Sequence, residues 1–382
     1  MKGICAIDIS SDKVFFSLAT SRKSKLIFLK EAEADLSCGS KSLVEFLKEN
    51  GEALNEKIKE NEKKLSIYAD KVYLNLPPGL ESRLFVEASI PLKKNKRITP
   101  ADISYAKKYL EDAYVAWEDI CLHHLVLNYE VEGNSYKTAP LGVTAKRVKI
   151  KSLLIVAKNK LYRDIDDILY NFGRKFCGFV FQGLSIWANT FEDFAVPESL
   201  AACYIGYDKT YMVIYKNGEF YFSDGYAFGL RNILEELSRK LLLPFPLAEE
   251  IFNRYVSFKE MPPIKEVSIK NGQQYISLST NTANSFVKDY LRQELGLIFE
   301  AIKPNLVPEI NITFSGRLNL KAGLADFLKG FLSYPIAMPL KNESVSLSFG
   351  CLRYGLFRFL EREHRVNISF INRIIGVYKE YF

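Results

Sequence analysis

One short pattern occurs in two distant places of the sequence. Residues 8–15 read DISSDKVF and residues 204–211 read YIGYDKTY, and apolar runs flank both segments. Each segment places an Asp-Lys pair between an isoleucine and an aromatic residue at matched offsets, and each predicts two strands joined by a turn. A chain of 382 residues that contains this unit twice has room for two related α/β halves.

The composition is that of a globular protein. Apolar residues make up 48% of the chain and charged residues 25%, which excludes collagen-like and disordered classes. The six cysteines form no CxxC pair, which suits a reducing cytosol better than a disulfide framework. The sequence predicts no signal peptide and no stretch of the ~18–20 apolar residues that a membrane span needs. The net charge of +7 permits anionic partners but requires none.

Apolar periodicity and capping residues predict the elements of the first half. The expected elements are strands over 3–9, 13–20, 26–32 and 72–78, with a helix over 40–64. Thr99 and Pro100 predict the start of a helix over 100–112, because Thr suits the N-cap and Pro the first turn. Strands over 121–132 and 145–157 and a helix over 161–174 then complete an inserted α+β unit.

The second half restarts the opening pattern at residue 199. The strand pair around YIGYDKTY is followed by a hairpin with Asn217-Gly218 at its turn. Helices are expected over 228–258 and 283–303, and residues 310–328 predict a strand, a turn and a helix.

The turn in each copy has residues that suit a phosphate group. A small residue lets backbone N–H groups approach an anion that a Cβ would otherwise hold away. A carboxylate that ends the preceding strand, as Asp8 does, can hold a hydrated Mg²⁺ that bridges phosphate oxygens. An ordinary hairpin has the same pattern, so these residues alone leave both interpretations open.

Three motifs in order resemble those of the actin-like ATPase superfamily. DISSDKV, IGYDKT and FSGRLNLKAGLADFL resemble its phosphate-1, phosphate-2 and adenosine motifs. Residues 96–113 and 139–191 are similar to the segment of the bacterial division protein FtsA that carries its 1C domain, where a PxGMxGxRL stretch precedes a strand and a long helix. SLSFGCLRYG (346–355) resembles the ATAVGLLLYG stretch of that family. The resemblance covers nearly the whole chain.

The resemblance implies an α/β fold of the actin-like (ribonuclease H-like) type in two halves, with an inserted α+β subdomain of the 1C (SHS2) type. It places the first half at 1–79 with 179–198, the insert at 80–178 and the second half at 199–355. Residues 356–382 would form a short connection and a C-terminal amphipathic helix. It also implies ATP with Mg²⁺ as cofactor and Asp8 as metal ligand. The implied cofactor-binding residues are Asp8, Ser10, Ser11, Lys13, Gly206, Thr210 and Gly316.

The second phosphate loop departs from the family pattern DIGGGTTD. Tyr204 stands in place of its first acid, Tyr207 and Asp208 in place of two glycines, Lys209 in place of a threonine, and Tyr211 in place of the last acid. A phenol cannot supply the anionic oxygen that Mg²⁺ prefers. Asp208 adds a negative charge near the phosphates unless Lys209 offsets it, and Arg317 stands for the second glycine of the adenosine motif. The sequence therefore predicts no catalytic residue and at most a weak ATPase.

The last sixteen residues, NISFINRIIGVYKEYF, alternate apolar and polar faces at helical spacing. A helix packed on the domain would have this pattern, but FtsA-like chains end in a helix that lies in the membrane interface, with basic residues that favour anionic lipid. The predicted membrane-binding residues are Ile368, Ile371, Arg373, Ile374, Ile375, Tyr378, Lys379 and Phe382.

The function that the resemblance implies is that of an adaptor. Such a protein polymerises and tethers the tubulin-like division ring protein to the cytoplasmic face of the bacterial inner membrane. The alternative is PilM, the actin-like cytoplasmic component of type IV pilus assembly. A third class, an active ATPase or sugar kinase of the same fold, is disfavoured by the missing second-loop acid. No nucleic-acid partner is expected, because PLKKNKR (91–97) is a single basic loop without interleaved aromatic residues.

Cys121, His123 and His124 suggest a zinc site at first sight. On a strand, Cys121 and His123 point to one face and His124 to the other, and no second ligand pair exists. A zinc site is therefore not predicted.

Overall fold

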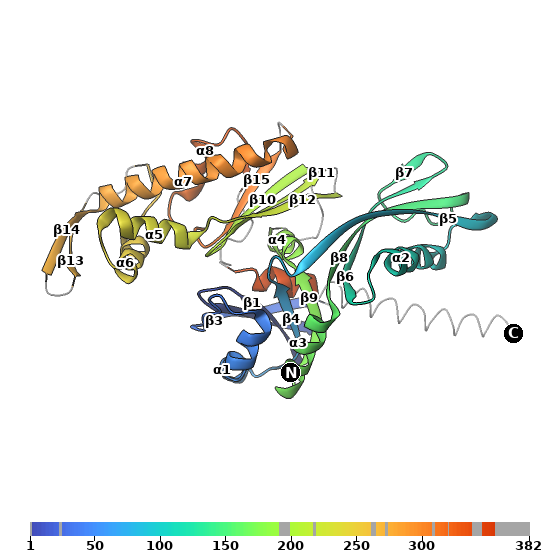
Figure 1. The fold of residues 1–382 in the computed structure, drawn as a ribbon, viewed down its shortest axis with the longest axis horizontal. Coiled ribbons are helices and arrows are strands. Elements are labelled where there is room, and N and C mark those ends of the chain that lie inside the picture. Colours follow the sequence, from blue (N-terminus) through green and yellow to red (C-terminus); the bar gives the residue numbers. More distant parts are fainter. Residues whose placement is uncertain are drawn as a thin grey trace. The chain divides into compact units, whose positions relative to one another are not determined.

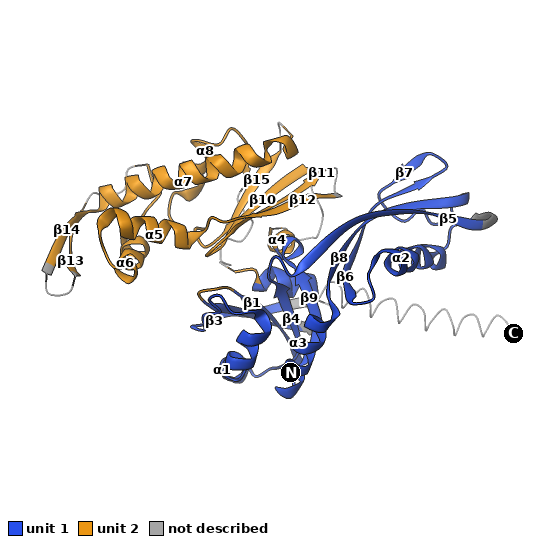
Figure 2. Ribbon diagram, in the orientation of Figure 1, with its two compact units in different colours: residues 1–9, 13–185, 348–382 blue, residues 10–12, 186–347 orange. Residues whose placement is uncertain are grey.

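A computed structural model describes residues 2–22, 25–190, 199–216, 219–260, 265–271, 274–307, 310–319, 321–337 and 346–355. The chain divides into two compact units, which Figure 2 distinguishes by colour. Unit 1 consists of residues 1–9, 13–185 and 348 onward, and unit 2 consists of residues 10–12 and 186–347. None of the helices among the described residues is long and apolar enough to cross a membrane.

The main sheet of unit 1 has five strands in the order β3-β2-β1-β4-β9. Figure 1 labels β1, β3, β4 and β9 of this sheet. β1 pairs antiparallel with β2 and parallel with β4, and the edge strand β9 is parallel to β4. The strands are β1 (Lys2–Ile9), β2 (Val14–Arg22), β3 (Lys25–Ala34), β4 (Tyr68–Leu76) and β9 (Lys175–Phe181).

Two helices, α1 (Leu43–Leu65) and α3 (Asn159–Asn171), complete the core of this sheet. α1 begins at a capping box, in which the Ser42 side chain accepts from the Glu45 N–H and the Glu45 carboxylate accepts from the Ser42 N–H. Phe46, Leu54 and Ile58 of α1 are buried against the sheet. The helix ends where Ser66 adopts a left-handed conformation with φ of 55°.

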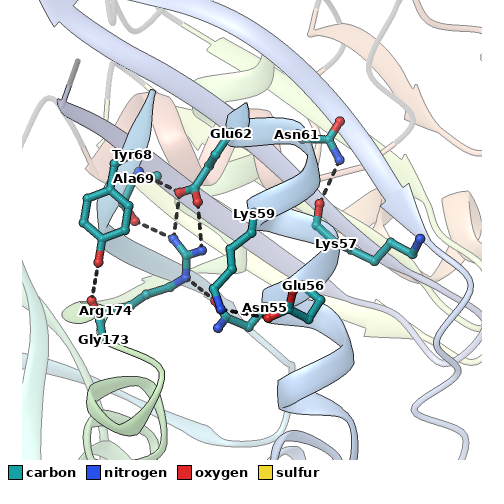
Figure 3. Close-up of polar contacts among 10 residues, drawn as sticks. All are labelled: Asn55, Glu56, Lys57, Lys59, Asn61, Glu62, Tyr68, Ala69, Gly173 and Arg174. Carbon is teal, nitrogen blue, oxygen red and sulfur yellow. Dashed lines mark hydrogen bonds and ion pairs between the residues drawn. The ribbon is translucent and has the colours of Figure 1, made fainter. Parts of the chain in front are cut away.

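A buried ion pair connects α1 to the strands beside it (Figure 3). Arg174 donates to both carboxylate oxygens of Glu62, at 2.9 and 3.2 Å, and to the carbonyl of Ala69 at 2.6 Å. Its Nε donates to Asn55 Oδ1 at 2.7 Å, and Glu62 also accepts from the Ala69 N–H at 2.7 Å. The two charged side chains are 2% and 5% exposed, so they are satisfied by one another and by their neighbours rather than by water.

A second sheet within unit 1 has its own core. Its strands run in the order β5-β8-β6-β7 and all pair antiparallel. They are β5 (Glu81–Arg97), β6 (Asp119–Val131), β7 (Asn134–Tyr136) and β8 (Thr144–Lys158), and α2 (Pro100–Tyr114) packs on β5 and β8. α2 begins at the predicted Thr99, which forms a capping box with Asp102. Ile103, Ala106 and Leu110 of α2 are buried in this core.

The insert predicted over 80–178 is smaller in the structure. The second sheet and α2 span residues 81–158, whereas α3 and β9 belong to the core of the first sheet. Ile165 of α3 and Phe176 of β9 are buried there. The reason is that β9 pairs with β4, which makes it an edge of the first sheet.

Unit 2 contains a sheet with the same plan. The order is β12-β11-β10-β15-β16, with β10 antiparallel to β11 and parallel to β15. The strands are β10 (Ser199–Ile205), β11 (Thr210–Lys216), β12 (Glu219–Tyr226), β15 (Asn311–Gly316) and β16 (Ile336–Ala337). Each unit therefore has three antiparallel strands followed by two parallel ones, as two related halves require.

The helices of unit 2 differ from the sequence prediction at one point. A single helix was expected over 228–258, but the chain forms α5 (Leu230–Leu241) and α6 (Phe245–Tyr255). Leu242 has φ of 52°, and Pro244 disfavours a helical conformation at the residue before it. The remaining elements include α4 (Gln182–Thr190), which the boundary between the units divides. They also include the hairpin β13 (Glu266–Asn271) and β14 (Gln274–Ser279), followed by α7 (Thr280–Ile302), η1 (Lys303–Asn305) and α8 (Leu324–Lys329).

The boundaries of the two units in the sequence also differ from those predicted. Residues 348–355 were expected in the second half, but they are helical and belong to unit 1. Ser348 hydrogen-bonds with Ser17 at 2.8 Å, and the Phe349 ring packs on Phe28 with centroids 4.6 Å apart. Residues 186–190, expected in the first half, belong to unit 2.

Candidate functional site

The two turns predicted to bind phosphate lie between equivalent strands. The first, Ser10–Asp12, follows β1, and the last paired residues before and after it are Ile9 and Val14. The second, Gly206–Lys209, follows β10 and is flanked by the pair Ile205 and Thr210. Ser10–Asp12 belongs to unit 2, so the contacts between the two turns lie within that unit.

The second turn packs on the start of α5. The Gly206 N–H donates to the Lys209 carbonyl at 2.9 Å and closes the turn. The carbonyls of Gly206 and Tyr207 accept from the N–H groups of Leu230 and Arg231, at 3.0 and 2.8 Å. These are first-turn N–H groups, which lack partners inside their own helix. The turn itself therefore satisfies N–H groups that would otherwise be available to an anion.

Asp208 interacts with one residue of the first turn and one residue of α5. Its carboxylate accepts a hydrogen bond from the Ser11 hydroxyl, and Arg231 Nε lies 3.0 Å from Asp208 Oδ1. Arg231 also approaches Ser11 Oγ at 3.4 Å, and its guanidinium lies 5.2 Å from the Tyr207 ring centroid. Burial raises the pKa of Asp208 above its ordinary value, Arg231 opposes that rise, and the carboxylate of Asp12 adds to it. Arg231 is thus the main cation that offsets Asp208, and the adjacent Lys209 contributes less.

Arg317 also binds the first turn, through Asp12. Its Nη2 donates to both oxygens of Asp12, at 2.8 and 3.0 Å, and the two side chains are only 11% and 17% exposed. The Arg317 N–H donates to the Ile205 carbonyl at 2.8 Å. The preceding Gly316 has φ of 107°, and a Cβ there would lie 2.2 Å from the same carbonyl oxygen. Only glycine fits that approach, which accounts for this part of the motif.

The other predicted residues of unit 2 have local partners. Thr210 is fully buried, and its hydroxyl donates to the Phe228 carbonyl at 2.8 Å. A Cβ on Gly206 would lie 2.8 Å from the Lys209 carbonyl, so this glycine is required by the turn itself. Tyr204, in the place of the family's acid, is buried in β10.

Two predicted residues belong to unit 1. The buried carboxylate of Asp8 accepts from Asn75 Nδ2 at 2.9 Å. Lys13 pairs with Glu33 at 2.9 Å and Asp35 at 3.3 Å. The predicted membrane-binding residues, which fall within 368–382, lie outside the described residues.

The two histidines that suggested zinc have other partners. His124 lies between Glu111, at 2.7 Å from Nδ1, and Ser152, at 2.9 Å from Nε2, and so links α2 to β8. His123 Nε2 accepts from the Phe181 N–H at 3.0 Å, and its ring packs edge-on against Tyr354. Among the described residues no group of three or more His, Cys, Asp and Glu side chains is arranged to hold a metal ion.

Comparison with known proteins identifies the fold. No family model matches the chain, and no curated protein matches its sequence. Among solved structures, PilM in the PilM–PilN type IV pilus biogenesis complex is 14% identical, with 92% of this chain and 97% of that chain covered and a TM-score of 0.58. MreB5 of Spiroplasma citri bound to ADP is 11% identical, with 97% and 99% covered and a TM-score of 0.54. MamK in its double helical filament is 10% identical, with 94% and 99% covered and a TM-score of 0.51.

These similarities and the paired sheets show that the chain has an actin-like ATPase fold with mixed α/β sheets. The predicted two-half actin-like fold is confirmed. The assignment of the second sheet to the 1C (SHS2) type stays a prediction.

Proposed function

We propose that this protein is an actin-like cell-division adaptor resembling FtsA, which assembles into filaments and tethers the tubulin-like division ring protein to the cytoplasmic face of the inner membrane. The observation that carries the proposal is the use of side chains at the phosphate turns of unit 2. Asp208 and Arg317 stand where the family has glycine, and both bind residues of the first turn. Charged side chains thus link the turns at positions where the family has glycine. This arrangement suits an adaptor better than an ATPase.

The described residues fit ATP with Mg²⁺ poorly. Asp208 places a carboxylate at the phosphate turns, and Tyr204 puts a phenol where the family's second loop has an acid that can bind a metal ion. MreB5 of Spiroplasma citri was solved with ADP, so the fold accepts a nucleotide. We propose weak binding in this chain, with Asp8 as the one remaining metal ligand.

Turnover of ATP is expected to stay well below about 1 s⁻¹, the lower end of typical enzyme rates. The physical reason is that Tyr204 stands in place of the first acid of the family's second phosphate loop, so one acid that could bind the metal ion is missing. Phosphate release by the full chain, measured with Mg²⁺ and saturating ATP, tests this. A rate at or above that value would overturn the adaptor proposal.

The second sheet of unit 1 carries a surface suited to self-association. Trp117, directly after α2, is 91% exposed, and Tyr105 and Tyr109 on α2 are 62% and 47% exposed. Large exposed aromatic residues are enriched at the centres of protein interfaces. MamK forms a double helical filament, and we propose that this chain also assembles, through this surface.

Trp117→Ser is expected to reduce filament formation on anionic vesicles at least about tenfold, because an aromatic anchor contributes ~2 kcal/mol or more to an interface. The variant should fold normally, since the side chain is exposed. Tyr170→Ser, which changes an aromatic residue of α3 that is 77% exposed, is the matched control. Electron microscopy and sedimentation with the tubulin-like division protein measure assembly and partner binding. Unchanged filaments in Trp117→Ser would contradict the assigned surface.

The alternative is a PilM-like role in type IV pilus assembly, which the similarity to PilM favours. The same sedimentation assay discriminates the two functions. Binding of a PilN-type segment without binding of the tubulin-like protein would replace the division role with the pilus role.

A further inference from the structure

Asp208 occupies a position with the donors of an anion site. A hydroxyl and a guanidinium are groups that bind phosphate oxygens in proteins, and here Ser11 and Arg231 direct both toward one carboxylate. Ser11 lies in the first turn and Arg231 at the start of α5, 220 positions apart in sequence. The carboxylate is therefore the acceptor that they share.

Arg231 is held in place independently of Asp208. Its backbone N–H donates to the Tyr207 carbonyl at 2.8 Å, and its guanidinium lies over the Tyr207 ring. The Asp12 carboxylate of the first turn binds a different arginine, Arg317, through both oxygens. Removal of Asp208 would thus leave a positioned arginine and a hydroxyl without the acceptor that they share.

We propose that the Asp208 carboxylate is a built-in substitute for a phosphate group, which fills an anion site made by Ser11 and Arg231. The turns of unit 2 are then joined with no nucleotide present. One consequence is that filament assembly does not require ATP, and this consequence rests on the proposed function. The anion site itself does not rest on the proposed function. The ligand class of the emptied site is a phosphate or pyrophosphate group.

The test is thermal unfolding of the full chain with and without millimolar pyrophosphate, at matched ionic strength. Wild-type protein should show no shift in Tm. Asp208→Ala should gain about 2–4 °C, the size expected when a ligand well above its Kd stabilises a domain of this size. Asp208→Ala combined with Arg231→Met should lose the gain. Asp208→Gly, which restores the family residue, is the second variant if alanine disturbs folding.

Asp289→Ala is the matched control. Asp289 pairs with Arg292 at 2.8 Å on the surface of α7, so its removal also frees an arginine, but away from both turns. The proposal is overturned if wild type responds as strongly as Asp208→Ala, if neither Asp208 variant responds, or if Asp289→Ala responds equally. These outcomes do not depend on filaments or on a partner, so a failure here is distinguishable from failure of the proposed function.

Discussion

Replacement of Arg174 by methionine is expected to lower the free energy of opening of the α1–β4 region by about 3–5 kcal/mol. The variant leaves the Glu62 carboxylate, whose contacts Figure 3 shows, buried without its cation, since Glu62 is 5% exposed. It also removes the donors to Asn55 and to the Ala69 carbonyl. Hydrogen exchange followed by mass spectrometry measures this region separately from unit 2.

Two controls separate the buried charge from simple loss of packing. Adding Glu62→Leu to Arg174→Met should recover much of the loss, because an apolar pair of similar volume can replace a buried ion pair. Arg239→Met removes a surface pair with Glu236, in which Arg239 is 75% exposed, and should cost below about 1 kcal/mol. If Arg174→Met costs no more than Arg239→Met, the ion pair does not stabilise unit 1 as described.

The elements that the sequence predicted well are those with local signals. α1 and α2 begin at or near the predicted residues because Ser42 and Thr99 cap them through side chains three residues away. The two strand–turn–strand units were predicted because their apolar alternation and turn residues lie within one short segment. The equal strand order of the two sheets then follows from their being related halves.

The elements that were missed depend on distant partners. β5 spans residues 81–97 and includes Pro91 and a basic run, which was interpreted as a loop. Its register against β8 shifts between Pro91 and Lys96, so the irregular segment is accommodated within the strand pair. Residues 348–355 were assigned to the wrong half because their partners, Ser17 and Phe28, lie more than 300 residues earlier.

The candidate site shows the same limit. The sequence identified Asp208 and Arg317 as departures from the family, but it proposed Lys209, the adjacent residue, to offset Asp208. The structure pairs Asp208 with Arg231 and Arg317 with Asp12, and the latter two are 305 positions apart. Ion pairs at such separations have no periodicity or spacing that a single sequence can display.

The second large effect is expected at the C-terminus, from Ile371→Glu combined with Ile374→Glu. Both residues lie in the apolar stripe of the predicted interfacial helix. Burial of two isoleucines contributes about 3–6 kcal/mol, so two carboxylates in their place should lower binding to anionic vesicles at least about a hundredfold. Vesicle sedimentation of the full chain measures this binding.

Ser369→Glu with Asn372→Glu adds the same charge to the opposite, polar face. That variant should lose only the electrostatic part, about 1 kcal/mol per charge, and the loss should shrink at high salt, where the attraction of Arg373 and Lys379 to anionic lipid is also screened. Wild-type binding should strengthen with assembly, because a filament presents many helices at once and raises their effective concentration. A stripe variant that binds vesicles like wild type would exclude the interfacial helix. One that unfolds would show that residues 367–382 pack against the domain, which would remove the membrane tether from the division proposal.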